Sequence, residues 1–154
     1  MIYYIKNEIN GGVSYPEKKV MARSALGAIN LLCKENLFTL EGYLKTTREI
    51  LGIKYKTPIV ISDFKVFFYT KSLKSYDNIF INFVAIDKSE KVDEYTRLTF
   101  EDEVLDLDLK YNEFIRISKH IFKILKYRES LVWIHFHSLI WWNHNVLHGI
   151  ITNG

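Results

Sequence analysis

The sequence contains little cysteine and has no signal-peptide pattern at its start. One cysteine among 154 residues cannot form a disulfide within the chain, and disulfides are rare in reducing compartments. The first residues also lack the basic segment followed by an apolar one that directs secretion. We therefore expect a cytoplasmic protein.

The motifs of common enzyme classes are also missing. Gly11-Gly12 has neither the spacing nor the following helix of a phosphate-binding loop. Cys33 and His120 are a lone thiol and a lone mid-chain imidazole, so a small buried apolar role for Cys33 is the simpler interpretation. Solvent exposure explains the acidic turn Glu101–Glu103 and the alternating Asp106 and Asp108, so these acids do not indicate the paired carboxylates of a glycosidase. The sequence predicts a protein that is not an enzyme and needs no cofactor.

What the chain does contain is enough apolar surface for a core. Hydrophobic residues make up 48% and aromatic residues 15% of the sequence, which excludes a compositionally disordered protein. The length suits about one domain, and no internal repeat or proline-rich linker divides it. We expect one α+β domain.

Turn and strand patterns dominate the first seventy residues. The segment Met1–Ile5 predicts a strand, Asn10-Gly11-Gly12 a turn and Val13–Tyr15 the returning strand, which Pro16 ends. Ser24 is suited to capping a short helix over residues 24–33. Residues 44–55 suggest a strand with a bulge at its glycine and with Lys54 and Lys56 on one face. A hairpin follows, with strands at residues 58–61 and 66–69.

The second half predicts further antiparallel strands and then a helix. Strands are expected at residues 79–86, 95–100 and 104–109, the last with leucines alternating against acids. A helix should begin near Asn112, because Phe114, Ile117 and Ile121 recur at helical spacing. The predicted fold class is α+β, with a mostly antiparallel sheet built from hairpins, one short N-terminal helix and a longer helix after the last strand.

The composition changes near residue 128, so we predict a domain over residues 1–127 and a separate tail over residues 128–154. From Ser130 onward the tail has no charged side chain, yet it holds all three tryptophans and four of the five histidines. The spacing of His135 with His137, and of His144 with His148, is compatible with zinc. An apolar extension packed on the domain or on another subunit, or a segment under no structural selection, is the favoured interpretation, with no metal. The tail is too short and too rich in histidine to cross a membrane.

Charge is distributed in blocks. Between Lys45 and Lys74 there are seven basic residues against two acidic ones, and between Asp87 and Glu113 four basic against ten acidic. Residues 114–129 are again basic, and Arg116, Lys119 and Lys123 form a second candidate patch. One face of the protein is therefore suited to an anionic partner, unless the blocks are simply solvated faces.

An ordered series of short elements from Cys33 to about Tyr127 resembles the ComK competence transcription factor family. Glu41-Gly42 stands where that family has a glycine, and Lys56-Thr57-Pro58-Ile59 resembles its Lys-Pro-Pro-Ile element. Phe67–Thr70, Leu98–Phe100 and Asn112–Phe114 resemble its aromatic strand, its late hairpin and the start of its terminal helix. The chain departs from the family at three positions: Leu37 replaces a glycine, Tyr43 an arginine and Thr57 a proline.

The resemblance implies a transcriptional activator that binds paired A/T-rich boxes in double-stranded DNA through the minor groove. It also implies a homo-oligomer, as a dimer or as paired dimers, whose level an adaptor–protease system controls. Lysine or arginine must enter narrow A·T grooves and neutralise phosphates. The candidate DNA-binding residues are Lys45, Arg48, Lys54, Lys56, Lys71 and Lys74, expected near strands and turns rather than on one recognition helix. The alternative is a truncated or divergent paralogue that acts as a protein-interaction module without strong DNA binding.

Overall fold

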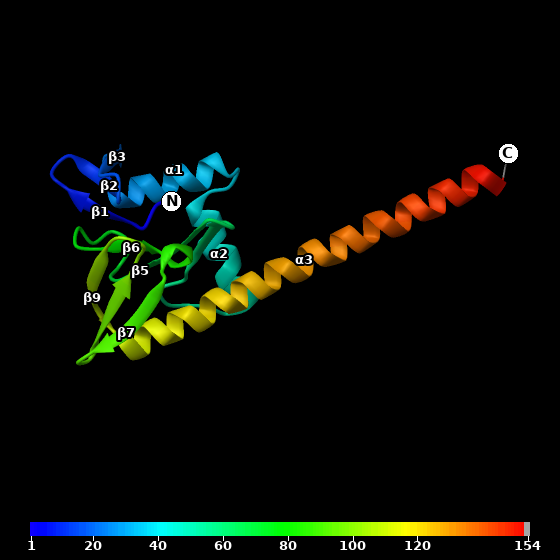
Figure 1. Cartoon of the computed structure of the whole chain (residues 1–154). Coiled ribbons are helices and arrows are strands. Elements are labelled where there is room, and N and C mark those ends of the chain that lie inside the picture. Colours follow the sequence, from blue (N-terminus) through cyan, green and yellow to red (C-terminus); the bar gives the residue numbers. More distant parts are fainter. Residues whose placement is uncertain (153–154) are drawn as a thin grey trace. The chain divides into compact units, whose positions relative to one another are not determined.

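In the computed structural model the chain divides into two compact units, residues 1–121 and residues 122–154. The structure describes the backbone of residues 1–152 and the side chains of residues 1–131. The first unit contains every strand described below (Figure 1). The second unit contains the later part of the helix α3 (Tyr111–Thr152). The compositional boundary at residue 127 stays a prediction.

The strands of the first unit form two antiparallel sheets. Its elements before α3 are β1 (Tyr4–Glu8), β2 (Gly11–Tyr15), β3 (Lys19–Ala22), α1 (Ala25–Glu35), α2 (Leu40–Leu51), β4 (Ile59–Ser62), β5 (Lys65–Tyr69), β6 (Ile79–Asn82), a 3₁₀ turn (Phe83–Ala85), β7 (Lys88–Val92), β8 (Tyr95–Thr99) and β9 (Val104–Lys110). One sheet has the order β3-β2-β1-β6-β5-β4 and the other β7-β8-β9. In the first sheet β1 and β6 are neighbours, with Tyr4 opposite Ile81. The predicted α+β class is confirmed.

Helices α1 and α2 pack on one face of the six-stranded sheet. Because side chains alternate along a strand, Phe67 and Tyr69 of β5 point to this face and Phe68 to the other. The first face buries one apolar cluster, which includes Ile5, Ala25, Ala28, Ile29, Leu32, Cys33, Leu40, Leu44, Ile59, Ile61, Phe67, Tyr69 and Phe80. On the opposite face the Phe68 ring lies 5.6 Å from the ring of Phe114 in α3. Each fully buried phenylalanine contributes roughly 2–3 kcal/mol to stability.

Aromatic and acidic side chains join the two sheets. The Tyr3 ring stacks on Phe100 with centroids 4.8 Å apart, and its hydroxyl donates to Asp102 Oδ1 at 2.7 Å. The Tyr4 hydroxyl donates to Glu103 Oε1 at 2.5 Å. Phe100, Asp102 and Glu103 belong to the β8–β9 connection, so β1 is attached directly to the second sheet.

The prediction of a strand over residues 44–55 is wrong, because residues 40–51 form α2. Threonines and isoleucines suggested a pleated surface, but Leu40, Leu44 and Thr47 are buried at helical spacing. The Thr39 side chain caps the helix by accepting from the Gly42 amide at 3.2 Å. Gly52 has φ +68° and ends it, so this glycine is a helix C-cap rather than a bulge.

Two strands were not predicted, and one predicted strand is shorter. β3 and β7 lie at sheet edges. β3 has only four residues and β7 has two lysines and an acid, so neither shows a clear alternation of apolar residues. The strand expected at residues 79–86 ends at Asn82. The buried Asn82 amide accepts from Val66 N and donates to Ile2 O and Phe64 O, and the 3₁₀ turn follows directly.

The remaining predicted elements are confirmed with small changes at their ends. β1 and β2 form the first hairpin, β4 and β5 the second, and β8 and β9 the third. Ser24 caps α1, because its hydroxyl accepts from the Gly27 amide at 3.0 Å. α3 begins at Tyr111 and buries Phe114, Ile117 and Ile121. The side chains of the histidines and tryptophans in the tail lie outside the described residues.

Candidate nucleic-acid interface

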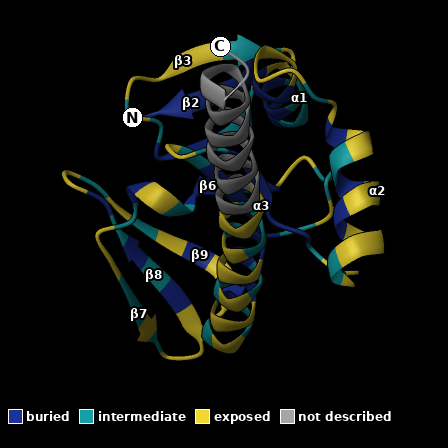
Figure 2. Cartoon of the chain, turned by 90° about the vertical axis from the view of Figure 1, so that its right-hand side faces the viewer, coloured by how far each residue is buried: buried dark blue, intermediate teal, exposed yellow. Residues whose placement is uncertain are grey.

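Two of the candidate DNA-binding residues lie on the outer side of α2. Lys45 and Arg48 are three residues apart and exposed, whereas Leu44 and Thr47 face the core. Figure 2 shows this division of α2 into a buried side and an exposed side. The two bases are therefore adjacent on an open helical surface. The prediction that the bases lie near strands and turns is wrong for this pair, because residues 40–51 are helical.

The charge of Arg48 acts on Tyr69, the last residue of β5. Burial raises the pKa of the Tyr69 hydroxyl to about 12, and the positive charge of Arg48 opposes that rise. A hydrogen bond from the Thr57 backbone also lowers the pKa of Tyr69, so the loop after α2 lies at the same place. The Tyr69 hydroxyl is therefore affected both by a charge on α2 and by the loop between α2 and β4.

The loop from Gly52 to Pro58 presents Lys54 to solvent and holds Lys56 inside. Ile53 and Thr57 are buried, and the Thr57 hydroxyl donates to Ile53 O at 3.2 Å. Lys54 is exposed, whereas the side chain of Lys56 is only 10% exposed. The expected common face of Lys54 and Lys56 is therefore wrong, because these residues are in a loop and not in a strand.

Lys71 and Lys74 lie in the loop that follows β5. The Lys71 amide donates to the side chain of buried Asn78, which fixes the start of this loop. The Lys71 ammonium lies 3.8 Å from Asp108 Oδ2, an exposed contact that contributes little to stability. Leu73 packs against the apolar cluster under α1 and α2, and Lys74 is exposed. Lys71 and Lys74 therefore lie on a loop attached to the same layer as α2.

Four side chains from the Gly52–Pro58 loop and from α3 form one connected group, the Glu113 cluster (Tyr55, Lys56, Glu113 and Arg116). Lys56 Nζ lies 2.8 Å from Glu113 Oε1 and donates to Thr70 O at 2.5 Å. Arg116 Nη2 lies 3.5 Å from the same Glu113 oxygen. The exposed Tyr55 ring lies 5.6 Å from Lys56 Nζ and 5.4 Å from Arg116 Cζ.

Sequence reasoning named Lys56 and Arg116 but missed Tyr55 and Glu113. The available signal was the Lys-Tyr-Lys run at residues 54–56, an aromatic residue between two bases. The distance of 57 residues between Lys56 and Glu113 hid their ion pair. In the second candidate patch Lys119 is exposed, whereas Lys123 belongs to the second unit.

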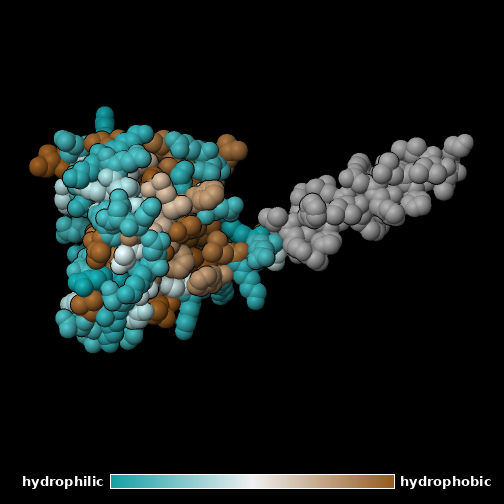
Figure 3. Space-filling model, in the orientation of Figure 1, coloured by the Kyte–Doolittle hydropathy of each residue, from teal (hydrophilic) through white to brown (hydrophobic). Residues whose placement is uncertain are grey.

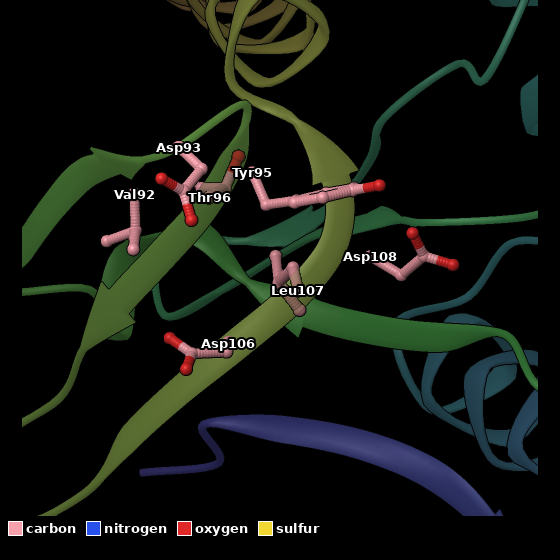
Figure 4. Close-up of a pocket in the computed structure, with 7 residues that line it drawn as sticks. All are labelled: Val92, Asp93, Tyr95, Thr96, Asp106, Leu107 and Asp108. Carbon is pink, nitrogen blue, oxygen red and sulfur yellow. The ribbon is translucent and has the colours of Figure 1, made fainter.

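The segment from β7 to β9 has the opposite net charge, because the connections between its strands are acidic. An open hollow of about 320 Å³ is lined by Val92, Asp93, Tyr95, Thr96, Asp106, Leu107 and Asp108. Figure 4 shows three carboxylates around it. The Arg97 guanidinium binds Asp106 through two hydrogen bonds, of 2.7 and 3.0 Å, and this pairing lowers the pKa of the Asp106 carboxyl. A surface rich in carboxylates repels phosphate, so this sheet is not suited to nucleic acid.

Cys33 and the possible metal-ligating side chains are the remaining candidates for a chemical site. Cys33 is fully buried in the apolar cluster, and burial raises the pKa of its thiol to about 11. Among the residues that the structure describes, no three metal-ligating side chains gather. Within the same part of the chain, no helix is long and apolar enough to cross a membrane.

Figure 3 shows hydrophilic residues over much of one face of the first unit, with hydrophobic residues among them.

Comparison with known proteins returns one family. None of the curated proteins and none of the solved structures compared with the chain matches it. The family model described as "ComK protein" matches residues 7–138, which extends beyond residues 33–127 on both sides. The basic surface around α2 and the strands from β2 to β9 lie within the matched range. The chain belongs to the ComK family of competence transcription factors, which are not enzymes.

Proposed function

We propose that this protein regulates competence genes by binding A/T-rich double-stranded DNA with the basic surface around α2. The supporting observation is that Lys45, Arg48 and Lys54 are exposed on α2 and the loop after it. Lys71 is half-buried and Lys74 is exposed on the loop after β5, and we assign both to the same DNA-binding surface. Such a group of bases neutralises phosphates and releases counterions. Because Lys56 is largely enclosed, we assign direct contacts to the other five bases.

We propose that the protein recognises A/T-rich boxes through contacts in the minor groove. A/T-rich tracts have a narrow minor groove whose negative potential attracts arginine and lysine. The exposed loops that hold Lys54 and Lys74 are the segments suited to reach such a groove. α2 then lies along the phosphates with Lys45 and Arg48. A ligand that occupies the minor groove should displace the protein, whereas a major-groove ligand should not.

The decisive experiment is an electrophoretic shift on an A/T-box fragment and on a G/C-rich fragment of the same length. We expect a preference for the A/T fragment and an affinity that falls steeply with salt. The double variant Lys45→Ala/Arg48→Ala should lower the slope of log affinity against log salt by roughly 2, since two phosphate contacts are lost. Lys88→Ala is the matched control, because Lys88 is an exposed lysine on β7. No shift at low salt, or equal affinity for both fragments, contradicts the proposal.

Family membership is also the support for three further proposals, on oligomerisation, turnover and location. We infer a homo-oligomer, as a dimer or paired dimers, because paired DNA boxes require at least two DNA-binding domains. An adaptor–protease system is proposed to control its level, and the cytoplasm is the proposed compartment. A solution mass that corresponds to a single chain at micromolar concentration contradicts the oligomer.

A protein-interaction module is the second candidate function. The hollow with Asp93, Asp106 and Asp108 favours it, because it provides an acidic surface for a basic partner. A paralogue of this kind keeps the fold, binds DNA poorly and associates with a full-length family member. Co-purification with such a member, together with absent DNA binding, supports this candidate over the first.

A further inference from the structure

Glu113 is an acid on α3 that contacts Lys56, in the loop that also carries Lys54 of the surface assigned to DNA. Its carboxylate accepts from Lys56 and lies 3.5 Å from Arg116, so one acid is shared by two bases. By Coulomb's law alone, an acid at this place repels phosphate, and its removal strengthens DNA binding. The geometry of the Glu113 cluster leads to the opposite expectation.

Lys56 is poorly placed for a direct phosphate contact. Its side chain is 10% exposed, and its ammonium is bound by Thr70 O and by Glu113. To reach a phosphate, Lys56 must break both hydrogen bonds, one of which is to a charged group. Its backbone is left-handed, with φ +46°, a conformation that is costly for a residue with a side chain. The hydrogen bond to Thr70 O and the ion pair with Glu113 offset the cost of this left-handed conformation.

The contacts of Lys56 fix the loop that contains Lys54 and Tyr55. The loop is anchored at both ends by buried Ile53 and Thr57, and Lys56 attaches it to Thr70, the residue after β5, and to α3. Between these anchors, Lys54 and Tyr55 remain exposed, with Tyr55 at 60%. Two cations lie beside the Tyr55 ring, so a basic and aromatic surface forms at this point. Aromatic side chains flanked by bases are suited to nucleic acid.

We infer that Lys56 and Glu113 are positioning residues, which hold Lys54, Tyr55 and Arg116 in the geometry that contacts DNA. This inference rests on the proposed function, since it assigns roles within the same surface. Lys56 acts through the loop and not by touching phosphate. Glu113 strengthens DNA binding although it is negatively charged, because it orders two bases and one aromatic ring.

The test is a series of substitutions at Glu113, measured by the shift on the A/T-box fragment at fixed salt. Glu113→Ala removes the acceptor and should weaken binding roughly fivefold. Glu113→Gln keeps an oxygen that accepts from Lys56 and should retain part of the affinity. The matched control is Glu49→Ala, because Glu49 is an exposed acid on α2, and its loss should leave binding equal or tighter. Charge alone predicts the reverse order, with both Glu113 variants tighter than the wild type.

A double-mutant cycle separates positioning from direct contact. Lys56→Met should weaken binding in the wild-type background and change it little in the Glu113→Ala background, because the ion pair is already lost. If Lys56 touches phosphate, Lys56→Met weakens binding in both backgrounds. Trypsin cleavage after Lys54 gives a measurement that needs no DNA, and Glu113→Ala should accelerate it. Circular dichroism confirms that each variant remains folded.

The outcomes distinguish this inference from the function on which it rests. If the wild-type protein does not shift the A/T-box fragment at low salt, the proposed function and this inference both fail. If the wild type binds and Glu113→Ala binds as tightly or more tightly, only this inference fails. A loss of affinity in Glu113→Ala that Glu113→Gln partly restores supports it.

Discussion

At the scale of single residues, the end of α1 shows how a side chain can occupy a position that suits glycine. The Phe38 amide donates to Cys33 O at 3.2 Å and the Leu37 amide to Lys34 O at 3.0 Å, the two bonds of a Schellman motif. This motif requires a left-handed residue, and Leu37 has φ +69°. The ComK family resemblance places a glycine at this position. The leucine therefore adds strain without a compensating contact, since its side chain is 95% exposed.

We predict that Leu37→Gly stabilises the protein. A left-handed backbone costs a residue with a side chain roughly 1–2 kcal/mol, and the greater freedom of glycine in the unfolded chain offsets part of this. The expected gain in the free energy of unfolding is about 0.5–1 kcal/mol, measured by urea denaturation. Leu31→Gly, in the interior of α1, is the control and should destabilise by about 1 kcal/mol. A loss of stability in Leu37→Gly would contradict the backbone strain assigned to Leu37.

At the scale of elements, α2 is attached to the free edge of β4. The Tyr43 hydroxyl donates to Pro58 O at 2.7 Å and accepts from Val60 N at 3.1 Å. β4 is the last strand of its sheet, so these backbone groups have no neighbouring strand on that side. Tyr43 replaces an arginine of the family and here provides the missing hydrogen bonds. The position of the basic face of α2 depends on this attachment.

Tyr43→Phe should destabilise the protein by about 1–3 kcal/mol. The substitution leaves two backbone groups without the partner that the hydroxyl supplies, while it keeps the ring and its packing. Urea denaturation gives the change in the free energy of unfolding. Tyr76→Phe is the control, because Tyr76 is exposed, and it should change stability by less than about 0.5 kcal/mol. Equal stabilities for the two variants would contradict the role of Tyr43.

At the scale of the first unit, hydrogen bonds between tyrosines and carboxylates connect distant segments. Tyr3 bonds to Asp102 and Tyr4 to Glu103, each across 99 residues, and Tyr15 bonds to Glu8. The hydrogen bond to Asp102 raises the pKa of Tyr3 to about 12, and that to Glu8 raises the pKa of Tyr15 to about 12. Burial raises the pKa of Tyr4 as well.

These pKa values predict that the protein loses stability in alkali. Tyrosines of the unfolded chain ionise near pH 10, whereas the folded protein keeps the protons of Tyr3 and Tyr15 up to about pH 12. The folded state therefore binds more protons, and its stability is fully present below pH 10 and falls between pH 10 and 12. The thermal midpoint measured from pH 8 to 12 checks this.

Tyr3→Phe is the control for the alkaline loss, because lysines also lose their charge in this range. The variant should be less stable at pH 8 and should lose less stability between pH 10 and 12 than the wild type does. Parallel curves for the two proteins would contradict the assignment.

The sequence by itself predicted the features that depend on neighbouring residues. The three hairpins, the Ser24 cap and the buried stripe of Phe114, Ile117 and Ile121 follow from turn residues and from periodicity, which are local signals. The family was also recognisable, because its elements occur in order at matching distances. The cluster of bases was visible as a block of charge along the chain.

The tertiary structure alone decided which of those bases are free to bind. α2 formed where β-branched residues indicated a strand, because burial of Leu40, Leu44 and Thr47 against the sheet outweighs intrinsic propensity. Lys54 and Lys56 look equivalent in sequence, yet an acid 57 residues further along the chain holds Lys56 inside. A contact between residues so far apart leaves no local pattern. The chain had to fold before Lys56 could be distinguished from its neighbour.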